Sequence, residues 1–473
     1  NQSDNYAKNF GIAYRSSTIF YFKKNKYFST LINFMDYWTI KKSIKVMIIA
    51  SLRDLSGKLV FRERLFFDKG NVINYRPKID VEDFEGSLEM EAIANDNLGI
   101  PFAAMLVVYE AKNSVSMVHG YTRTYTSHEI EEGKVIVQGE EAGLVCRDND
   151  EIKSFIIGHN GVNKQASQII KLWVTNSEGK KLLKEFKLRE LKPYETFKIY
   201  PSEYFENFKD FLNNKPGNCA ISYKLNGGFT RLLVGNETVS GDEFQIYHSN
   251  FNYGRHEPGY VSNSDGYYSY PYSRLHERQI THVDPFCAEG KFEIQSEEKK
   301  VNFSSGKREN IQMKGEVLKI NRIDGDLPAR INIVFSAFLK GSKCKLPMES
   351  ARGFYHTNRP PKYRLWMAAS IGKKFRSKII IHSLTDLYGP VDDSKLEIIL
   401  FRESTFDTIK KALNKEDLEK FKEGVYVDEL FSDVSKKKDH EMCQLWINAS
   451  YGGHQAYTTI EAKNGSASIE HNY

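Results

Sequence analysis

Residues 43–67 read SIKVMIIASLRDLSGKLVFRERLFF, a β-rich run of the kind that decides the fold of this chain. Similar runs recur at residues 168–188, QIIKLWVTNSEGKKLLKEFKL, and at residues 377–401, SKIIIHSLTDLYGPVDDSKLEIILF. Each copy closes at a histidine that is followed shortly by a tyrosine, and these histidines are His119, His248 and His471. A block that returns at long intervals predicts an architecture of repeated folding units.

The spacing inside the copies supports this interpretation. Tyr75, Tyr200 and Tyr426, each with a hydrophobic residue one or two positions before it, mark the middle of the copies. They lie 44, 48 and 45 residues before the closing histidines. The same tyrosines lie 32, 32 and 49 residues after the start of the opening run, so the third copy is longer in one place. The excess falls at residues 406–424, where apolar residues recur at helical intervals. We therefore predict a helix inserted into the third β-unit, with Ile409, Leu413, Leu418 and Phe421 on one face.

The length of the chain and its hydrophobic pattern limit the possible fold classes. The 473 residues suffice for about three domains of ordinary size, and the chain is rich in Tyr and Phe. Strand and helix patterns do not alternate, which disfavours a parallel α/β sheet. We predict a mainly β protein of tandem antiparallel β-sandwich repeats with short helical insertions. The expected domains are repeat 1 at 1–128, repeat 2 at 129–253, a Tyr/Gly-rich linker with extra strands at 254–324, and repeat 3 with the helical insertion at 325–473.

Composition disfavours several functional classes. The net charge of +6 is too small to argue for a nucleic-acid partner. No apolar run reaches the roughly 18–20 residues that span a bilayer, so no membrane span is expected. Five cysteines without a CxxC pair, and a start without a secretory pattern, favour reduced thiols in the cytoplasm. The usual nucleotide, zinc-protease and hydrolase motifs are absent from the sequence.

The closing histidines are the first candidate for chemistry. His119, His248 and His471 occupy equivalent places in the three copies. If the copies pack around a common axis, three imidazoles can converge and bind zinc, copper or iron. The alternative is that each histidine ends a strand and hydrogen-bonds a neighbouring loop. We therefore expect no cofactor, with a transition metal as the alternative.

Two surfaces are candidates for ligand binding. Residues 352–378 combine many cations with aromatic side chains and contain no acidic residue, a pattern that suits an anionic ligand. The candidates there are Arg352, Arg359, Lys362, Arg364 and Trp366. Tyrosines in the predicted linker suit sugar rings or a protein partner. These are Tyr260, Tyr267, Tyr268 and Tyr270. The alternatives are strands with basic outer and aromatic inner faces, and a loop that packs across a junction.

An acidic pair on one predicted strand is a weaker candidate. Leu88, Met90 and Ala92 alternate with Glu89 and Glu91, which places the two carboxylates on one strand face. Such a pair suits a glycosidase, but nothing nearby in the sequence supports a sugar-cleaving site. We therefore predict an exposed acidic face.

These observations favour a non-catalytic binding or assembly protein built of repeated β-sandwich modules, with a glycan, another anionic ligand or a protein as its partner. One alternative is a metal-dependent enzyme that uses the closing histidines. Another is a structural protein of a virion or surface layer. The sequence leaves the oligomeric state open. The distance between the three histidines in space separates the first two hypotheses, because only histidines that meet can share a metal ion.

Overall fold

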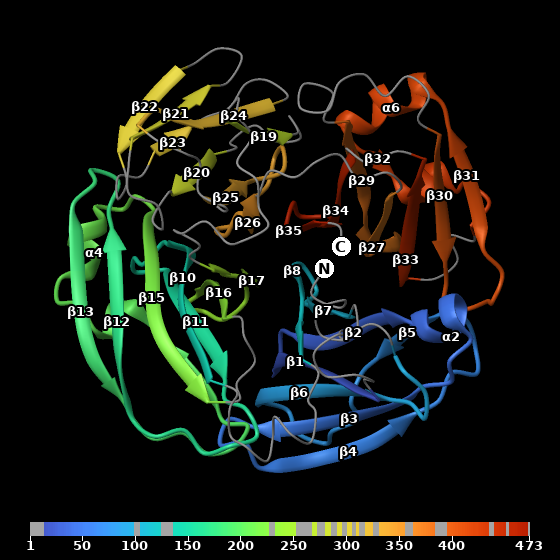
Figure 1. The fold of residues 1–473 in the computed structure, drawn as a ribbon, viewed down its shortest axis with the longest axis horizontal. Coiled ribbons are helices and arrows are strands. Elements are labelled where there is room, and N and C mark those ends of the chain that lie inside the picture. Colours follow the sequence, from blue (N-terminus) through green and yellow to red (C-terminus); the bar gives the residue numbers. More distant parts are fainter. Residues whose placement is uncertain are drawn as a thin grey trace.

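The computed structural model describes residues 14–98, 105–123, 136–226, 232–251, 267–271, 280–284, 291–295, 300–304, 309–311, 317–324, 331–354, 363–383, 395–434, 439–450 and 454–471. It is mainly β, with several separate antiparallel sheets and few helices, as predicted. The strands fall into four successive groups, which lie in a ring when the molecule is viewed as in Figure 1. We call these groups units 1 to 4.

Unit 1 contains two antiparallel sheets, with the strand orders β4-β3-β6-β1-β9 and β5-β2-β7-β8. Its strands are β1 (Arg15–Lys24), β2 (Ser29–Met35), β3 (Met47–Asp54), β4 (Leu59–Leu65), β5 (Val72–Tyr75), β6 (Phe84–Ile93), β7 (Met105–Glu110), β8 (Val115–His119) and β9 (Tyr121–Arg123). Runs such as Met47–Asp54 form strands because β-branched and aliphatic residues suit a buried pleated surface.

Unit 2 has the same arrangement, with the orders β13-β12-β15-β10-β18 and β14-β11-β16-β17. Its strands are β10 (Ile136–Cys146), β11 (Ile152–His159), β12 (Gln168–Thr175), β13 (Lys181–Leu188), β14 (Thr196–Ile199), β15 (Gly217–Asn226), β16 (Leu233–Thr238), β17 (Phe244–His248) and β18 (Asn250–Phe251). Counted along the chain, corresponding strands of the two units occupy corresponding places in their sheets.

Unit 3 follows the same strand order, with sheets β19-β24-β21-β22 and β23-β20-β25-β26. Its strands are β19 (Tyr267–Pro271), β20 (Ile280–Asp284), β21 (Lys291–Gln295), β22 (Lys300–Ser304), β23 (Glu309–Ile311), β24 (Val317–Arg322), β25 (Ile331–Ala337) and β26 (Met348–Phe354). The sequence predicts a linker with extra strands at residues 254–324. Pairing of β20 with β25, and of β25 with β26, carries one sheet across the expected boundary at 324.

Unit 4 completes the ring with the sheet β27-β33-β30-β31 and a second sheet in which β34 pairs with β28, β29 and β35. Its strands are β27 (Tyr363–Gly372), β28 (Phe375–Arg376), β29 (Lys378–Ser383), β30 (Leu396–Phe401), β31 (Ile409–Leu413), β32 (Val425–Tyr426), β33 (His440–Ala449), β34 (His454–Ala462) and β35 (Ala467–His471). The tyrosine markers fall at corresponding strands, because Tyr75 ends β5, Tyr426 ends β32, and Tyr200 directly follows β14.

The described helices are short. They are α2 (Tyr37–Lys42), the 3₁₀ turn η1 (Pro201–Glu203), α4 (Phe208–Leu212), α6 (Lys415–Lys422) and α7 (Val427–Leu430). The helix predicted within 406–424 is present only in part. Ile409 and Leu413 lie in β31, so the inserted segment contains a strand followed by the helix α6.

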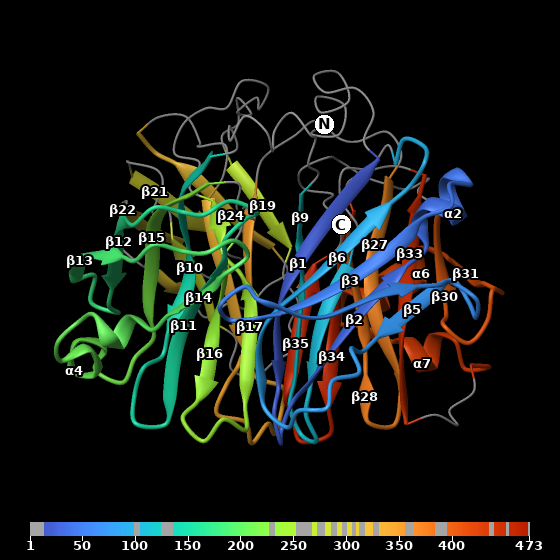
Figure 2. The same ribbon diagram turned by 90° about the horizontal axis from the view of Figure 1, so that it is seen from below.

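The last strand of the second sheet in each unit faces the middle of the ring. We call β8, β17, β26 and β35 the closing strands; β8 contacts β17 and β35, and β26 contacts the same two strands. Figure 2 shows that strands such as β16 and β17 run roughly along the viewing direction of Figure 1. The four closing strands therefore surround a common axis.

The same side-chain bonds join successive closing strands. The Ser468 hydroxyl accepts from the Met117 N–H at 2.9 Å and donates to the Met117 carbonyl at 3.2 Å. The Ser116 hydroxyl makes the equivalent pair of bonds to Ile246, at 2.9 and 3.3 Å. Unit 4 therefore contacts unit 1 as unit 1 contacts unit 2.

Packing is continuous across the units. The largest hydrophobic cluster of unit 1 also includes Phe155 and Phe244 of unit 2 and Trp446 of unit 4. The acidic face predicted at Glu89 and Glu91 is not exposed, since the two residues are 0% and 7% exposed. That prediction was wrong because Arg53 and Arg15 pair with the two carboxylates, and Tyr194 of unit 2 lies over the Arg53 guanidinium.

Candidate functional site

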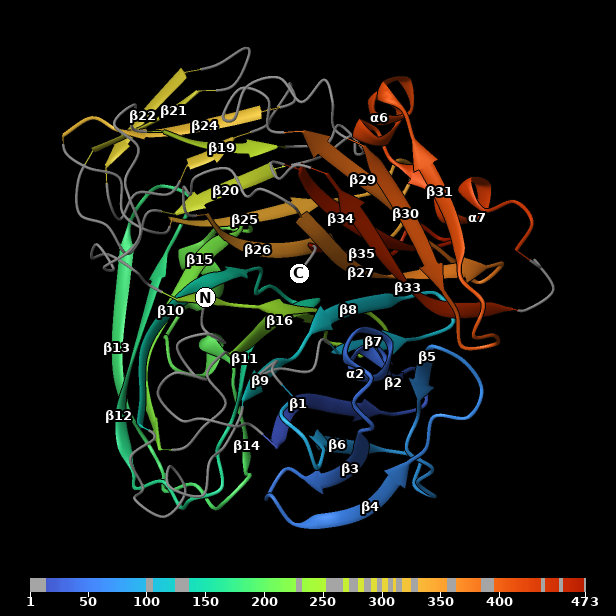
Figure 3. The ribbon, with the colours of Figure 1, turned by 45° about the vertical axis from the view of Figure 1, so that its right-hand side comes forward.

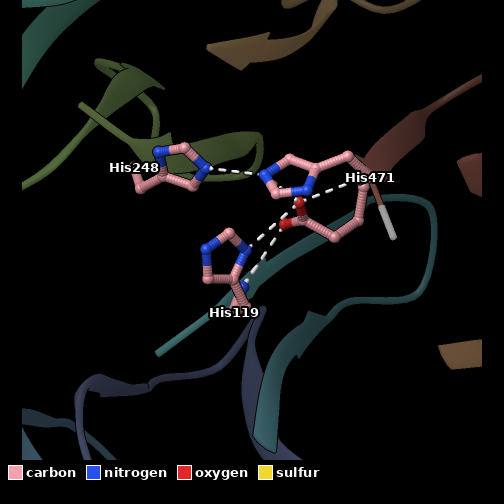
Figure 4. A group of neighbouring side chains, drawn as sticks. His119, His248 and His471 are labelled. Carbon is pink, nitrogen blue, oxygen red and sulfur yellow. Dashed lines mark hydrogen bonds and ion pairs between the residues drawn. The ribbon is translucent and has the colours of Figure 1, made fainter. Parts of the chain in front are cut away.

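The three closing histidines meet at the axis of the ring (Figure 4). The ring centroids of His119 and His248 lie 4.5 Å apart, those of His119 and His471 5.0 Å, and those of His248 and His471 5.4 Å. Each histidine is the last residue of its five-residue closing strand, in unit 1, 2 or 4. The corresponding residue of β26 in unit 3, counted from the start of the strand, is Arg352.

Glu470 completes this group, and together with the three histidines it forms what we call the axis cluster. Its carboxylate accepts from the backbone N–H groups of His119, at 3.3 Å, and His471, at 2.9 Å. Its Oε1 atom also lies 3.2 Å from His119 Nδ1 and 3.6 Å from His471 Nε2. The carboxylate therefore joins the ends of the closing strands β8 and β35.

Glu470 remains ionised in this position. Burial by itself would raise its pKa, but the adjacent imidazoles of His119 and His471 and the backbone N–H of His471 lower the pKa to about 2. A carboxylate that stays charged at neutral pH can act as an anionic ligand for a cation.

Hydrogen bonding orients His248 toward the cluster. Its Nδ1 lies 2.8 Å from the carbonyl oxygen of Ser249, which can only accept, so Nδ1 carries the proton of the neutral ring. Nε2 then carries a lone pair, and it lies 3.1 Å from His471 Nε2. A carbonyl that fixes the tautomer in this way is the usual support of a metal-binding histidine.

The four side chains offer a compact set of ligand atoms. One atom from each residue can be chosen so that all four lie within 4.8 Å of one another. A tetrahedral zinc ion with bonds of about 2.0–2.1 Å needs ligand atoms about 3.3 Å apart. The axis cluster therefore requires only small side-chain movements to reach this geometry.

Access to the axis cluster is one-sided. His119, His248 and Glu470 are 7%, 3% and 4% exposed, whereas the side chain of His471 is 24% exposed. Solvent therefore approaches the cluster past His471.

The predicted ligand-binding residues do not form one site. Arg352 lies on β26, and Tyr267, Tyr268 and Tyr270 lie on β19, in the other sheet of unit 3. Arg364 and Trp366 lie on β27 of unit 4. Arg359, Lys362 and Tyr260 lie outside the described residues.

Units 1 and 4 lie side by side in Figure 3. Trp366, on β27 of unit 4 with Arg364, contacts Tyr37 in α2 of unit 1. The ring of Trp366 lies 4.2 Å from that of Tyr37 and 6.0 Å from that of Trp446, measured between centroids. The guanidinium carbon of Arg364 lies 4.6 Å from the centroid of Trp446. Arg364 and Trp366 therefore belong to the same contact between units 1 and 4.

The sequence patterns do not single out Glu470, Tyr37 or Trp446. Glu470 directly precedes a closing histidine only in the last copy, whereas Val118 and Tyr247 hold that place in the other two. The acidic neighbour was visible in the sequence, but its contact with His119 depends on the packing of unit 4 against unit 1. Tyr37 lies more than 300 positions before both Trp366 and Trp446, and those two tryptophans are 80 positions apart. No local sequence pattern therefore links the three residues.

No known protein family matches the chain, and a search of the curated proteins finds no relative. Within the part of the chain that the structure describes, no helix is long and apolar enough to cross a membrane.

Proposed function

We propose that this protein binds one transition-metal ion at the axis cluster. The convergence of three histidines from three units on one ionised carboxylate is the observation that supports the proposal. Three imidazole nitrogens and one carboxylate oxygen suit zinc, with copper and iron as competitors for the same donors.

The number of donors favours a structural ion. A four-coordinate structural site uses only protein ligands, whereas a catalytic zinc usually has three protein ligands and a water molecule. The axis cluster supplies four donors from the ends of three closing strands. An ion held there would link units 1, 2 and 4, which accords with a non-catalytic binding or assembly protein.

Metal content tests the proposal directly. Protein stripped with a chelator, incubated with zinc and dialysed should contain about one zinc ion per chain by elemental analysis. The variants His248→Ala and His119→Ala should retain little zinc, because each loses one of the four donors. His382→Gln is the matched control, since His382 is 4% exposed but lies outside the axis cluster.

Equal zinc content in the wild type and His248→Ala would contradict the proposal. Zinc far below one ion per chain in the wild type would contradict it as well, provided that copper and iron are also absent after incubation with those ions.

A metal-dependent enzyme is the second candidate, favoured by the exposed edge of His471. If Glu470 stays paired with His119, a water molecule could take its place on the ion, and a zinc-bound water ionises near neutral pH. Zinc-loaded wild type should then hydrolyse an activated ester, such as p-nitrophenyl acetate, faster than zinc-treated His248→Ala. Equal rates would exclude this candidate and leave the structural ion.

A further inference from the structure

A second group of side chains, independent of the axis cluster, lies where helix α2 of unit 1 meets strands β27 and β33 of unit 4. We call it the cation–aromatic junction, and it comprises Tyr37, Lys41, Lys42, Arg364, Trp366 and Trp446. Lys41 Nζ lies 5.0 Å from the ring centroid of Tyr37 and 5.8 Å from that of Trp366. Arg364 lies over Trp446, so cations from two units lie against one group of aromatic rings. We call these rings, Tyr37, Trp366 and Trp446, the aromatic floor.

Two rings of the floor, Tyr37 and Trp446, are buried, and Trp366 is half-buried. Tyr37 is 7% exposed and Trp446 5% exposed, and Trp446 Nε1 donates to Met35 Sδ at 3.0 Å. Arg364 is held in place because its Nε donates to Asn448 Oδ1 at 2.7 Å. A guanidinium has five N–H donors, so this bond leaves most of them for a ligand.

The charges at the junction are of one sign. Burial lowers the pKa of Lys41, and the neighbouring cations Arg364 and Lys42 lower it further. Among the ion pairs between described residues, none involves Lys41, Lys42 or Arg364. Like charges gathered over an apolar floor repel one another, and a bound anion would relieve that repulsion.

The arrangement also limits the kind of anion. Lys41 already covers a face of Tyr37, and Arg364 covers a face of Trp446, so these rings do not present open platforms for a base or a sugar. Proteins that bind single-stranded nucleic acid rely on such open platforms. The cations, rather than the rings, are the groups presented to a ligand.

We propose that the cation–aromatic junction binds a compact polyvalent oxyanion, such as a group of phosphates or sulfates. The oxyanion would contact Lys41, Lys42 and Arg364, and so bridge the first and last units of the ring. This site does not depend on metal binding at the axis cluster.

Calorimetric titration at low salt can test the proposal with three probes. These are inorganic tripolyphosphate, a heparin-derived tetrasaccharide and a ten-residue oligothymidylate. Wild-type protein should bind tripolyphosphate or the tetrasaccharide, and raising the salt concentration should weaken binding because exposed charges are screened. The tighter of these two probes tells whether phosphates alone or sulfates on sugar rings are preferred.

Alanine substitutions show which residues of the junction contact the anion. Lys41→Ala and Arg364→Ala should each weaken binding by about tenfold, the effect expected for one lost charge-assisted hydrogen bond. Lys26→Ala is the matched control, since Lys26 also lies over a tyrosine ring, Tyr27, with its Nζ 4.8 Å from the centroid. His248→Ala should bind as the wild type does, which separates the junction from chelation of a metal at the axis cluster. Unchanged thermal melting of the variants shows that they remain folded.

Three results would overturn the proposal. The first is that none of the probes binds. The second is that Lys26→Ala weakens binding as much as Lys41→Ala, which indicates a diffuse charge effect. The third is that the oligothymidylate binds more tightly than both other probes and depends on Lys41, which shows that bases contribute and that the ligand is a nucleic acid.

Discussion

Glu89 is buried in an ion pair on one face of β6. Arg53 donates to its Oε2 at 2.7 Å, and the Tyr194 ring of unit 2 lies over the Arg53 guanidinium at 3.9 Å. Leu88 faces the opposite side of the strand. The period of two assigns a face, but the partner that packs on that face comes from a residue more than 100 positions away.

The Arg53–Glu89 pair gives the first stability prediction. Burial raises the pKa of Glu89, Glu91 raises it further, and Arg53 and Arg15 lower it. Arg53→Met should lower the free energy of unfolding by about 3–5 kcal/mol, because it leaves a buried carboxylate without its main partner. Urea titration measures this change.

Two further variants test the cause. The double variant Arg53→Met/Glu89→Gln should be less destabilised than Arg53→Met, since no buried charge remains. Arg62→Ala, at an exposed arginine of β4, should stay within about 0.5 kcal/mol of the wild type. A double variant no more stable than Arg53→Met would argue against an unpaired charge as the cause.

His159 gives a pH prediction. Burial lowers its pKa to about 3, while an unfolded histidine titrates near 6.5. Below about pH 6.5 the unfolded chain therefore binds a proton that the folded chain does not, and this one site removes about 1.4 kcal/mol of stability for each pH unit down to about 3.

The variant His159→Asn keeps a group that can bond the Thr196 hydroxyl, which lies 2.9 Å from Nδ1. Between pH 6.5 and 5 the wild type should lose about 2 kcal/mol more stability than this variant does. Parallel slopes of unfolding free energy against pH in the two proteins would show that His159 is not the source.

Among the structural elements, the segment 406–424 shows how a helical interval can mislead. Its apolar positions predicted one helix, but β31 pairs with β30 through Ile409 to Leu413, and only residues 415–422 are helical. Asn414 separates the two parts, because its side chain accepts from the Asp417 N–H and Asp417 accepts from the Asn414 N–H. A capping box is a local start signal that outweighs the apolar spacing here.

Asn414→Ala should destabilise the protein by about 1 kcal/mol, the usual effect of losing an N-cap acceptor. Asn414→Asp is the control, since it retains an acceptor and places a negative charge at the helix N-terminus. Thermal unfolding compares the two. If Asn414→Ala and Asn414→Asp melt at the same temperature, the cap contributes nothing measurable.

The arrangement of the whole molecule was predictable in part. The spacing between the copies identified the three histidines. Their convergence could be predicted on the single assumption that the units pack around a common axis. The structure has four units with one strand order. Unit 3 escaped notice because its closing strand carries Arg352 where the other three carry histidine, and because the Gly- and Ser-rich residues 254–266 directly precede its first strand in the sequence. Arg364 and Trp366, two residues apart on β27, share a face as their spacing requires, but the helix α2 opposite them is not visible from the sequence.

Contacts between units should contribute measurably to stability. Glu237 of unit 2 lies 3.2 Å from Lys23 Nζ of unit 1 and 2.9 Å from Lys198 Nζ of its own unit. Burial would raise the pKa of Glu237, but Lys198 and Lys23 lower it to about 2, and Tyr200 donates to the same carboxylate. Since the folded pKa is depressed, the stabilisation is present above about pH 4.5 and is lost as the pH falls toward 2.

Glu237→Gln should therefore be less stable than the wild type by about 3 kcal/mol at pH 7, and the difference should shrink as the pH falls from 4.5 to 2. Chemical unfolding at several pH values measures it. Lys345→Ala offers a comparison, since that lysine pairs with Glu151 at an exposed site and should have little effect. A difference independent of pH would rule out the ionised carboxylate as its source.

The paired bonds of Ser116 and Ser468 fix the registration of the closing strands to single residues. Adding or removing one residue in such a strand would turn every following side chain to the opposite face and withdraw its histidine from the axis. The extra residues of unit 4, including α6, lie on the perimeter and away from these bonds (Figure 1). Changes in chain length are thus tolerable on the outside of the molecule and disruptive at its centre, so a loop graft or affinity tag belongs beside α6 and away from β8, β17 or β35.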